Sequence, residues 1–197
     1  AFSKEHMGIT AENVSRKYNI TRQEQDQFAY QSYLKTYKAL KNKYFKNELI
    51  KSDFKDQVRQ DTTLAKLTHL KAVFKSKGSV TAGNASSLND GAAFIVLASD
   101  SFIKTNKIKP LAKILSWSTS AGNPNYMGIT PISAIQNLIK KMSVNLSYFD
   151  LIEINEAFAA TSVAVQRTLK IDPNKLNIAG GAIALGHPIG CSGARII

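Results

Sequence analysis

A continuous apolar run, AFIVLAS at residues 93–99, is the feature that most constrains the fold of this chain. An uninterrupted run of this length is typical of a strand that is covered on both faces, as in a buried parallel sheet. Shorter apolar segments predict further strands at 111–118, 150–154 and 175–181. Helical patterns lie between several of these segments, so the sequence predicts an α/β fold with a largely buried sheet.

Several segments carry helical signals. The sequence TRQE at 21–24 has the spacing of a capping box, in which Thr21 and Glu24 each satisfy a backbone N–H group of the other, and it predicts a long amphipathic helix to about Tyr44. Residues 46–62 are polar and irregular, which predicts a surface segment. Further helices are predicted over 10–18 with Thr10 as N-cap, over 132–142 and 156–169, and from about residue 189.

The composition is that of a globular protein and argues against several other classes. Of the 197 residues, 44% are hydrophobic and 20% are charged, which is enough for a substantial core. No apolar run approaches the ~20 residues that a membrane-spanning helix needs. The single cysteine, Cys191, excludes a disulfide framework within these residues and is compatible with a reducing compartment.

The net charge of +12 allows several kinds of partner. Excess lysine and arginine can bind nucleic acid, an anionic membrane surface, or the phosphates of a small molecule. The densest basic stretch, residues 35–51, has instead the spacing of a solvated helix face, and no nucleic-acid recognition motif occurs. We therefore expect neither a nucleic-acid nor a membrane partner.

Both ends of the sequence suggest that it belongs to a longer protein. It begins AFSKEHMG, without an initiator methionine or a signal-peptide pattern, and it ends SGARII, which reads as the first turns of a helix. We expect a fragment, for which targeting signals cannot be judged. Cytoplasm and mitochondrion are both open as compartments.

Three motifs rich in glycine or asparagine lie at the ends of predicted strands: VTAGNASSLNDGAA at 80–93, NEAFAA at 155–160 and GGAIALGHPIGCSGAR at 180–195. In α/β proteins, ligands collect at such strand ends, although each motif alone is also compatible with an ordinary turn. Together with MGITAENVSRKYNITRQEQDQFAYQS at 7–32, they resemble the thiolase family in order and spacing. The resemblance covers the whole chain and corresponds to the later part of a thiolase.

The resemblance implies a thiolase-like α/β fold, with layers in the order αβαβα and mixed sheets, of which only a part is present. Residues 1–105 would form the coenzyme A-binding loop subdomain and the end of the N-terminal thiolase half. Residues 106–197 would form a truncated C-terminal half.

The resemblance also implies an activity: a reversible Claisen condensation of two acetyl-CoA molecules to acetoacetyl-CoA, through an acyl-cysteine and ping-pong kinetics. Coenzyme A thioesters would be substrates, with no metal and no permanently bound cofactor. The nucleophilic and the acid/base cysteine of thiolases lie in segments that this chain does not contain, so we expect it to be inactive alone. Thiolases form homodimers or homotetramers, and the same is expected here.

Two residues would carry chemistry in this chain. By resemblance, His187 activates the nucleophilic cysteine and donates to the thioester oxygen, and Asn155 holds a water that is the other donor to that oxygen. The chemistry suits both side chains, because a neutral imidazole accepts a thiol proton and an amide donates without changing charge. Cys191 matches a position where the family tolerates alanine, so we expect a buried packing residue there.

The sequence His-Met-Gly at the start of the chain indicates the substrate. Thiolases that prefer acetoacetyl-CoA commonly carry it, so His6 would meet the 3-keto group or the thioester, while Met7 and Met127 would narrow the acyl pocket. A surface role for His6 stays open. So do two other functions for the chain: a thiolase for longer 3-ketoacyl-CoA in fatty-acid degradation, and a non-catalytic protein that binds acyl-CoA or lipid.

Coenzyme A contacts are also implied by the resemblance, which would make part of the basic excess a partner for the phosphates of that molecule. The stretch 47–63 is shorter than its counterpart in the family. The match places Ala82, Gly83 and Ser86 beside the pantetheine, Arg59 near the adenine, and Leu67, Phe74, Ala157 and Phe158 along the tunnel.

Overall fold

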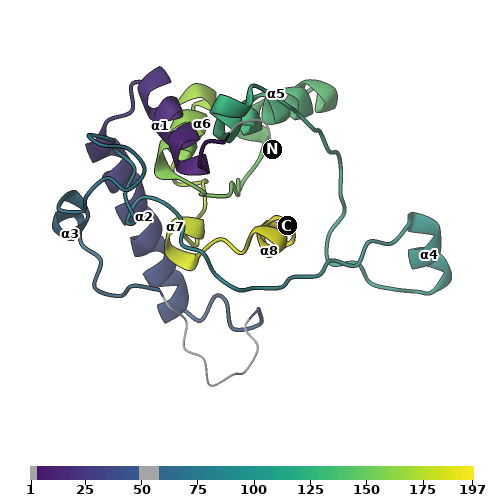
Figure 1. Ribbon diagram of the computed structural model, residues 1–197. Helices are drawn as coiled ribbons and strands as arrows, with labels where there is room; N and C mark the ends of the chain where they lie inside the picture. Colours follow the sequence, from purple (N-terminus) through teal and green to yellow (C-terminus); the bar gives the residue numbers. More distant parts are fainter. Residues whose placement is uncertain (1–3, 49–57) are drawn as a thin grey trace.

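The computed structural model describes residues 4–48 and 58–197, and the regular structure in these ranges is helical (Figure 1). Part of the predicted surface segment 46–62 lies outside the described residues. The longer helices are α1 (Met7–Lys17), α2 (Arg22–Lys41), α5 (Thr130–Met142), α6 (Ala159–Leu169) and α8 (Ile189–Ile196). The shorter ones are α3 (Leu64–Thr68), α4 (Asp100–Thr105) and α7 (Ala182–Leu185), with 3-10 turns η1 (Pro124–Ile129) and η2 (Leu146–Tyr148).

The predicted capping box is confirmed. The Thr21 hydroxyl accepts from the Glu24 N–H at 3.2 Å, and Glu24 Oε2 accepts from the Thr21 N–H at 2.7 Å. Two backbone N–H groups at the start of α2 thus find acceptors in the side chains of the capping box. The helix ends at Lys41 rather than Tyr44, because Lys43 takes a left-handed conformation with φ of 56°.

The predicted start of the first helix is wrong. Its N-cap is His6 rather than Thr10, because His6 Nδ1 accepts from the Gly8 N–H at 3.0 Å. Thr10 lies one turn inside α1, where its hydroxyl donates to the Met7 carbonyl at 2.7 Å. The helices predicted at 132–142 and from residue 189 are confirmed, and the one predicted from 156 begins later, at Ala159.

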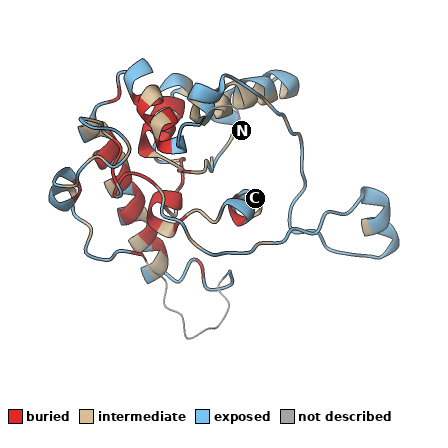
Figure 2. Cartoon of the chain, viewed as in Figure 1, coloured by how far each residue is buried: buried red, intermediate tan, exposed pale blue. Residues whose placement is uncertain are grey.

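The core lies where α6 meets α1, α2 and η1, and where α2 meets α7 (Figure 2). Helix α6 begins with Ala159 and Ala160, both fully buried, and carries fully buried Ala164 further along. Small side chains allow neighbouring helices to approach closely. Val14 of α1 and Ala29 of α2 are fully buried in the same region.

The predicted strands do not form as continuous strands within residues 4–48 and 58–197. Segments 150–154 and 175–181 do pair, through one parallel bridge between Ile152 and Leu176. There the Ile152 N–H donates to the Lys175 carbonyl at 2.9 Å, and the Asn177 N–H donates to the Ile152 carbonyl at 2.9 Å. The two segments are therefore adjacent, but the ladder between them is a single bridge.

Segments 93–99 and 111–118 lie in a long excursion, residues 88–123, which we call the arm. It leaves the helical body, carries α4 at its far end and returns to η1 (Figure 1). Phe94 and Val96 are each 94% exposed, so the prediction of a buried strand is wrong for the described chain. The physical reason is that neither segment pairs with another described segment.

No helix in the described ranges is long and apolar enough to cross a membrane.

Candidate active site

Asn155 and His187 meet in space although 32 residues separate them in the chain. Asn155 Nδ2 lies 3.3 Å from His187 Nε2, and both side chains are partly buried. An amide nitrogen is only a donor, so this contact directs the Asn155 N–H toward the lone pair of Nε2. The two residues with chemical roles expected from the sequence thus form one pair.

The position of Asn155 depends on Asn177. Asn177 Oδ1 accepts from the Ile154 N–H at 2.8 Å, and Asn177 Nδ2 donates to the Ile154 carbonyl at 2.9 Å. Both backbone groups of the residue before Asn155 are therefore held by one buried amide. Asn177 also donates to Glu156 Oε1 at 2.8 Å, so it fixes the residues on both sides of Asn155.

Glu156 connects this segment to α2 and α7. Its carboxylate is 1% exposed, and Oε2 accepts from Ser32 Oγ at 2.6 Å and from the Ile183 N–H at 3.3 Å. Ser32 Oγ in turn accepts from the Gly181 N–H at 3.0 Å. A side chain at position 181 would put its Cβ 2.3 Å from the Glu156 carboxyl carbon, so only glycine fits there. Burial raises the pKa of Glu156, against the lowering effect of its donors.

His187 follows a sharp backbone turn. Helix α7 ends at Gly186, whose φ of +92° lies in the region that favours glycine. The His187 N–H donates to the Ser87 carbonyl at 3.0 Å, and His187 Nδ1 lies 2.7 Å from Ser192 Oγ on α8. Burial lowers the pKa of His187, so its neutral form is favoured at neutral pH.

The motif at 80–93 is joined to the start of α6. The fully buried Asn84 donates through Nδ2 to Asp26 Oδ1 at 2.9 Å, and its carbonyl accepts from the Ala159 N–H at 2.8 Å. Two residues further on, the N–H and the hydroxyl of Ser86 both donate to the Ala157 carbonyl, at 3.0 and 3.1 Å. All three sequence motifs therefore converge on Asn155 and His187.

An aromatic row leads from the start of α1 toward the same segment. The rings of His6 and Phe74 stack with centroids 4.8 Å apart, and Phe74 meets Phe158 edge to face at 6.1 Å. His6 Nδ1 accepts from Gly8, so in the neutral ring the proton is on Nε2, which is then a donor. Three of the expected binding residues are thus brought together.

The remaining expected binding residues differ from one another in how far they are exposed to solvent. Leu67 is 3% exposed and packs in the core with Ala29 and Tyr33, so it supplies packing in this structure. Arg59 is exposed, and its carbonyl accepts from the Tyr37 hydroxyl. Met7 and Met127 are each 46% exposed, Ala82 is exposed, Gly83 is buried, and Ala157 is partly buried.

Cys191 is 5% exposed and lies at the start of α8. Its neighbour Ser192, rather than Cys191, bonds the imidazole of His187. The sulfur packs toward Gly91, where an added Cβ would lie 3.4 Å from Sγ.

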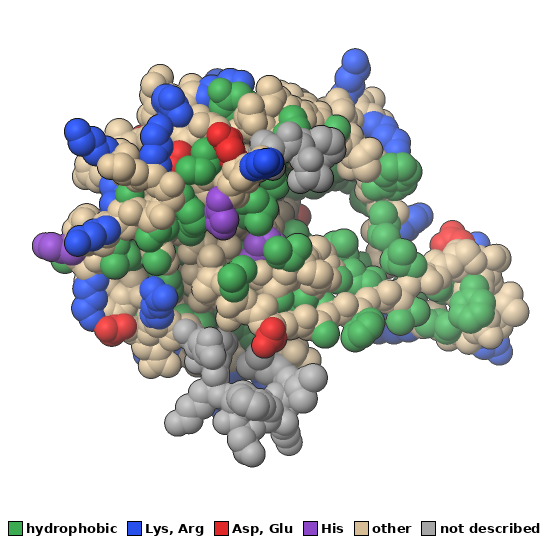
Figure 3. Space-filling view, in the orientation of Figure 1, with side chains coloured by type: hydrophobic (Ala, Val, Ile, Leu, Met, Phe, Trp, Pro, Cys, Tyr) green, Lys and Arg blue, Asp and Glu red, His purple; other side chains and the backbone are tan. Residues whose placement is uncertain are grey.

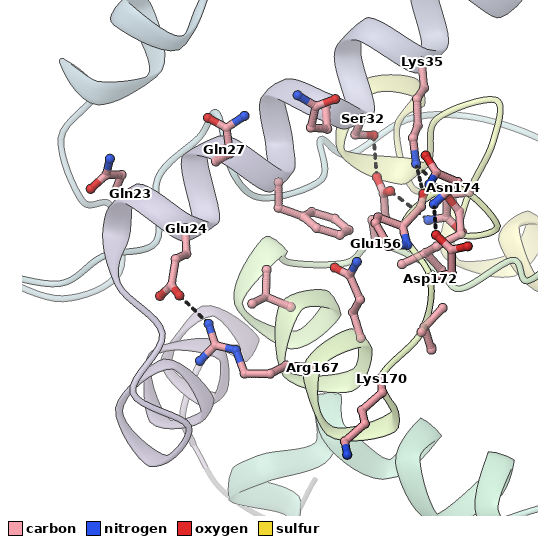
Figure 4. A pocket seen from close by; sticks show the side chains of 18 residues that line it. Gln23, Glu24, Gln27, Ser32, Lys35, Glu156, Arg167, Lys170, Asp172 and Asn174 are labelled. Carbon is pink, nitrogen blue, oxygen red and sulfur yellow. Dashed lines mark hydrogen bonds and ion pairs between the residues drawn. The ribbon is translucent and has the colours of Figure 1, made fainter. Parts of the chain in front are cut away.

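A pocket with a volume of about 1090 Å³ lies elsewhere, between α2, α6 and residues 171–177 (Figure 4). Lys35 and the ion pair of Glu24 with Arg167 line it, and Glu156 is at its inner end. Lys35 Nζ donates to the carbonyls of Pro173 and Leu176, at 2.9 and 2.7 Å. Neither Asn155 nor His187 lines this pocket, so it is separate from the pair. No cluster of His, Cys, Asp and Glu suited to a metal occurs in the described part of the chain.

Sequence reasoning missed Glu156, Asn177 and Ser192. Glu156 had a visible signal, because an acidic residue directly before an apolar helix is rarely buried without partners. Asn177 had a weaker one, as a polar residue inside an apolar segment. Ser192 had none beyond its place near His187.

Comparison with known proteins defines the class. The thiolase N-terminal domain family matches residues 1–101, and the thiolase C-terminal domain family matches residues 108–197. The chain belongs to the thiolase family.

Individual relatives agree with this assignment. Proteins named probable acetyl-CoA acyltransferase from Staphylococcus aureus strains COL and NCTC 8325 are each 44% identical over 208 aligned residues, which is 100% of this chain and 53% of theirs. The Bacillus anthracis acetyl-CoA acetyltransferase superposes with a TM-score of 0.93 at 44% identity, over 99% of this chain and 52% of that one. Human mitochondrial 3-ketoacyl-CoA thiolase gives 0.88 at 41% identity, over 96% and 50%. The chain therefore spans about half the length of these relatives, and the expected partial thiolase fold is confirmed.

Proposed function

We propose that this chain is the later part of an acetyl-CoA C-acetyltransferase, which condenses two acetyl-CoA molecules to acetoacetyl-CoA and coenzyme A and runs the reaction in reverse. The observation that carries the proposal is the 3.3 Å contact between Asn155 and His187 at the convergence of the motifs. The names of the bacterial relatives and the coenzyme A complex of the human thiolase support thioester substrates.

In this mechanism His187 is the base for the nucleophile. Its pKa is lowered by burial, so Nε2 carries a lone pair at neutral pH and can take the proton of a thiol. The resulting imidazolium stabilises the thiolate, which attacks the thioester carbonyl and releases coenzyme A. The amide of Asn155 stands beside Nε2, where it can hold a water that donates to the developing oxyanion.

The two cysteines of the reaction belong, in this proposal, to the half of the relatives that this chain does not span. Cys191 is buried on α8 and is not the group bonded to His187. The 197 residues alone are therefore expected to show no turnover.

A chimera tests the function directly. The 197 residues replace the matching half of the Staphylococcus aureus relative, which supplies the rest of the chain. The chimera is expected to cleave acetoacetyl-CoA with coenzyme A by ping-pong kinetics. Removing one oxyanion donor typically costs roughly 10²–10³-fold in kcat, so Asn155→Ala and His187→Ala should each lose at least that factor.

Cys191→Ala is the matched control, because it removes a buried sulfur from the adjoining helix without touching the pair. It should keep kcat within about twofold, as expected where no interaction with the reacting groups is lost. Activity that survives His187→Ala would overturn the proposed role of the pair.

The short acyl chain is supported by the row of His6, Phe74 and Phe158, because His6 presents a donor and the two phenyl rings occupy space beside it. A 3-ketoacyl-CoA thiolase for longer chains is the second candidate, supported by the human structure at 41% identity. A chain-length series on the chimera separates them: a four-carbon substrate should be best, and a preference for eight carbons or more selects the second. Binding of acyl-CoA without any turnover would support the non-catalytic alternative.

Three further expectations accompany the proposal. The assembled enzyme is a homodimer or homotetramer, which sedimentation of the chimera measures. It acts without a resident metal or cofactor, so exhaustive dialysis against chelator should leave its rate unchanged. Relatives come from bacteria and human mitochondria, so both cytoplasm and mitochondrion fit as compartments.

A further inference from the structure

We propose that Ser192 is a positioning residue that stabilises one tautomer of His187, with the ring proton on Nδ1 and the lone pair of the base on Nε2. The inference rests on the proposed function for its catalytic meaning. The tautomer itself follows from three hydrogen bonds that form one directed chain, from Asn155 through His187 and Ser192 to the Pro188 carbonyl.

The first constraint comes from Asn155. Its Nδ2, which only donates, lies 3.3 Å from His187 Nε2. A proton on Nε2 would place two donors against each other, so Nε2 must present its lone pair. In a neutral imidazole the single N–H is then on Nδ1.

The second constraint comes from Ser192. Its Oγ lies 2.7 Å from His187 Nδ1 and 3.1 Å from the Pro188 carbonyl oxygen. With the Nδ1–H tautomer that Asn155 favours, the hydroxyl proton goes to the Pro188 carbonyl, which also accepts the N–H groups of Cys191 and Ser192. The oxygen of Ser192 is left as an acceptor, and the Nδ1–H of His187 is the donor that it meets.

The two contacts favour the same tautomer, Asn155 by facing the lone pair of Nε2 and Ser192 by accepting the Nδ1–H. In the opposite tautomer the Nε2–H would face the Asn155 N–H, and Nδ1 would lose its role as donor to Ser192. Ser192 is 6% exposed, so water does not readily replace it. Ser192 lies near the start of α8, which begins at Ile189, and its backbone N–H also donates to the Pro188 carbonyl, at 3.0 Å. These contacts hold the residue in place.

The consequence is a defined proton transfer. When a thiol approaches and replaces the Asn155 N–H at Nε2, its S–H bond breaks, the electron pair stays on sulfur, and an N–H bond forms at Nε2. The Nδ1–H remains bonded to Ser192 throughout, so the imidazolium keeps its partner. In the opposite tautomer Nε2 would already carry a proton and could not accept one.

Ring nitrogens of histidine report the tautomer directly, because protonated and bare nitrogens resonate far apart in ¹⁵N spectra. The chain contains three histidines, so ¹⁵N-histidine labelling gives few signals, and His187→Gln assigns the one of interest. The 197-residue chain at a pH where the rings are neutral is expected to show His187 protonated at Nδ1. A signal with the proton on Nε2 would overturn the proposal without any variant.

Variants test whether Ser192 is responsible for the tautomer of His187. Ser192→Ala should convert the His187 signals to a mixture of tautomers, and Ser192→Thr, which keeps a hydroxyl, should restore the Nδ1–H form. Cys191→Ala should leave the signals unchanged. An unchanged His187 tautomer in folded Ser192→Ala, checked by circular dichroism, would refute the role of Ser192.

The chimera with the Staphylococcus aureus half adds a kinetic readout. Ser192→Ala is expected to lower kcat by roughly 10–100-fold with KM nearly unchanged, the range seen when the partner that orients a functional histidine is removed. A rise in KM by a similar factor, with kcat unchanged, would contradict a role of Ser192 in positioning the base. If the chimera shows no activity at all, the proposed function fails, while the ¹⁵N result still decides the tautomer.

Discussion

The motif junction and the arm contain equally apolar sequences but have opposite environments. At the junction, formed by residues 152–158 and 176–192 against α2 and α6, Ile183 is 2% exposed and Leu176 is 3% exposed. In the arm, residues 88–123, Leu97 is 72% exposed and Leu111 is fully exposed. In the space-filling view, many apolar side chains are visible along the surface of the arm (Figure 3).

The difference shows that an apolar pattern alone does not determine whether a segment is buried. Burial also requires a surface of the folded chain against which the segment can pack. At the junction three segments distant in sequence supply that surface. The arm has none among the described residues, and a segment that exposes backbone N–H and C=O groups cannot form a stable strand alone.

The largest expected contrast is in amide hydrogen exchange. Amides of segments 93–99 and 111–118 should exchange nearly as fast as in an unfolded chain, because these segments belong to no helix or bridge. Amides of α6 should be slower by several orders of magnitude, since exchange there requires opening of the core. In the chimera with the Staphylococcus aureus half, the arm segments should become protected. Slow exchange in the arm of the 197-residue chain would contradict the comparison.

A matched pair of leucines gives the next effect. Leu176→Ala should lower the free energy of unfolding by about 2–5 kcal/mol, since it removes a buried side chain from the core. Leu111→Ala removes the same atoms from the arm and should change it by less than about 0.5 kcal/mol. Urea unfolding measures both free energies. Equal losses for the two variants would contradict the difference between the junction and the arm.

Glu156 tests the polar side of the junction. Glu156→Ala leaves Ser32, Asn177 and the Ile183 N–H without their acceptor, which should cost on the order of 3 kcal/mol. Glu48→Gln is the control, because that side chain is half exposed and should change stability by less than about 0.5 kcal/mol. Unchanged stability of Glu156→Ala would show that the carboxylate does not hold the junction together.

The smallest effect is a pH dependence at His187. Burial lowers the pKa of His187 in the folded chain below its ordinary value of about 6.5, so the unfolded chain binds its proton first. Stability from this group is complete above pH ~6.5 and is lost as the pH falls through that value toward the folded pKa. The wild type should therefore lose more stability than His187→Gln between pH 8 and 5.

Taking the difference between the two proteins cancels other titrations, including that of Glu156, whose pKa is raised by burial. Identical pH slopes for wild type and His187→Gln in urea unfolding would show that burial does not shift the pKa of this imidazole.

Much of the local structure was predictable from the residues. The capping box at Thr21 and Glu24 is a short-range signal and needs no tertiary contact, so α2 begins where the sequence predicts. The start of α1 was missed because His6 caps it with a ring nitrogen, which is an uncommon N-cap. The strands were missed because pairing is non-local and one bridge at Ile152 and Leu176 is all that forms between the two segments.

The site was predictable in part. The motifs identified Asn155 and His187, and the structure places them in contact. Glu156, Asn177 and Ser192 act through hydrogen bonds to other segments or to the ring, and such bonds depend on coordinates that sequence spacing does not provide. The roles of the expected coenzyme A contacts stay predictions.

The sequence by itself determined the thiolase family and the helical segments with strong local signals, and it pointed to the two side chains that we propose carry chemistry, because motifs and caps act over a few residues. Only the tertiary structure decided which apolar runs are buried, that Glu156 joins three segments, and which groups face the two ring nitrogens of His187. The physical reason is that burial and hydrogen-bond direction depend on groups brought close by folding, and those groups lie far away along the chain.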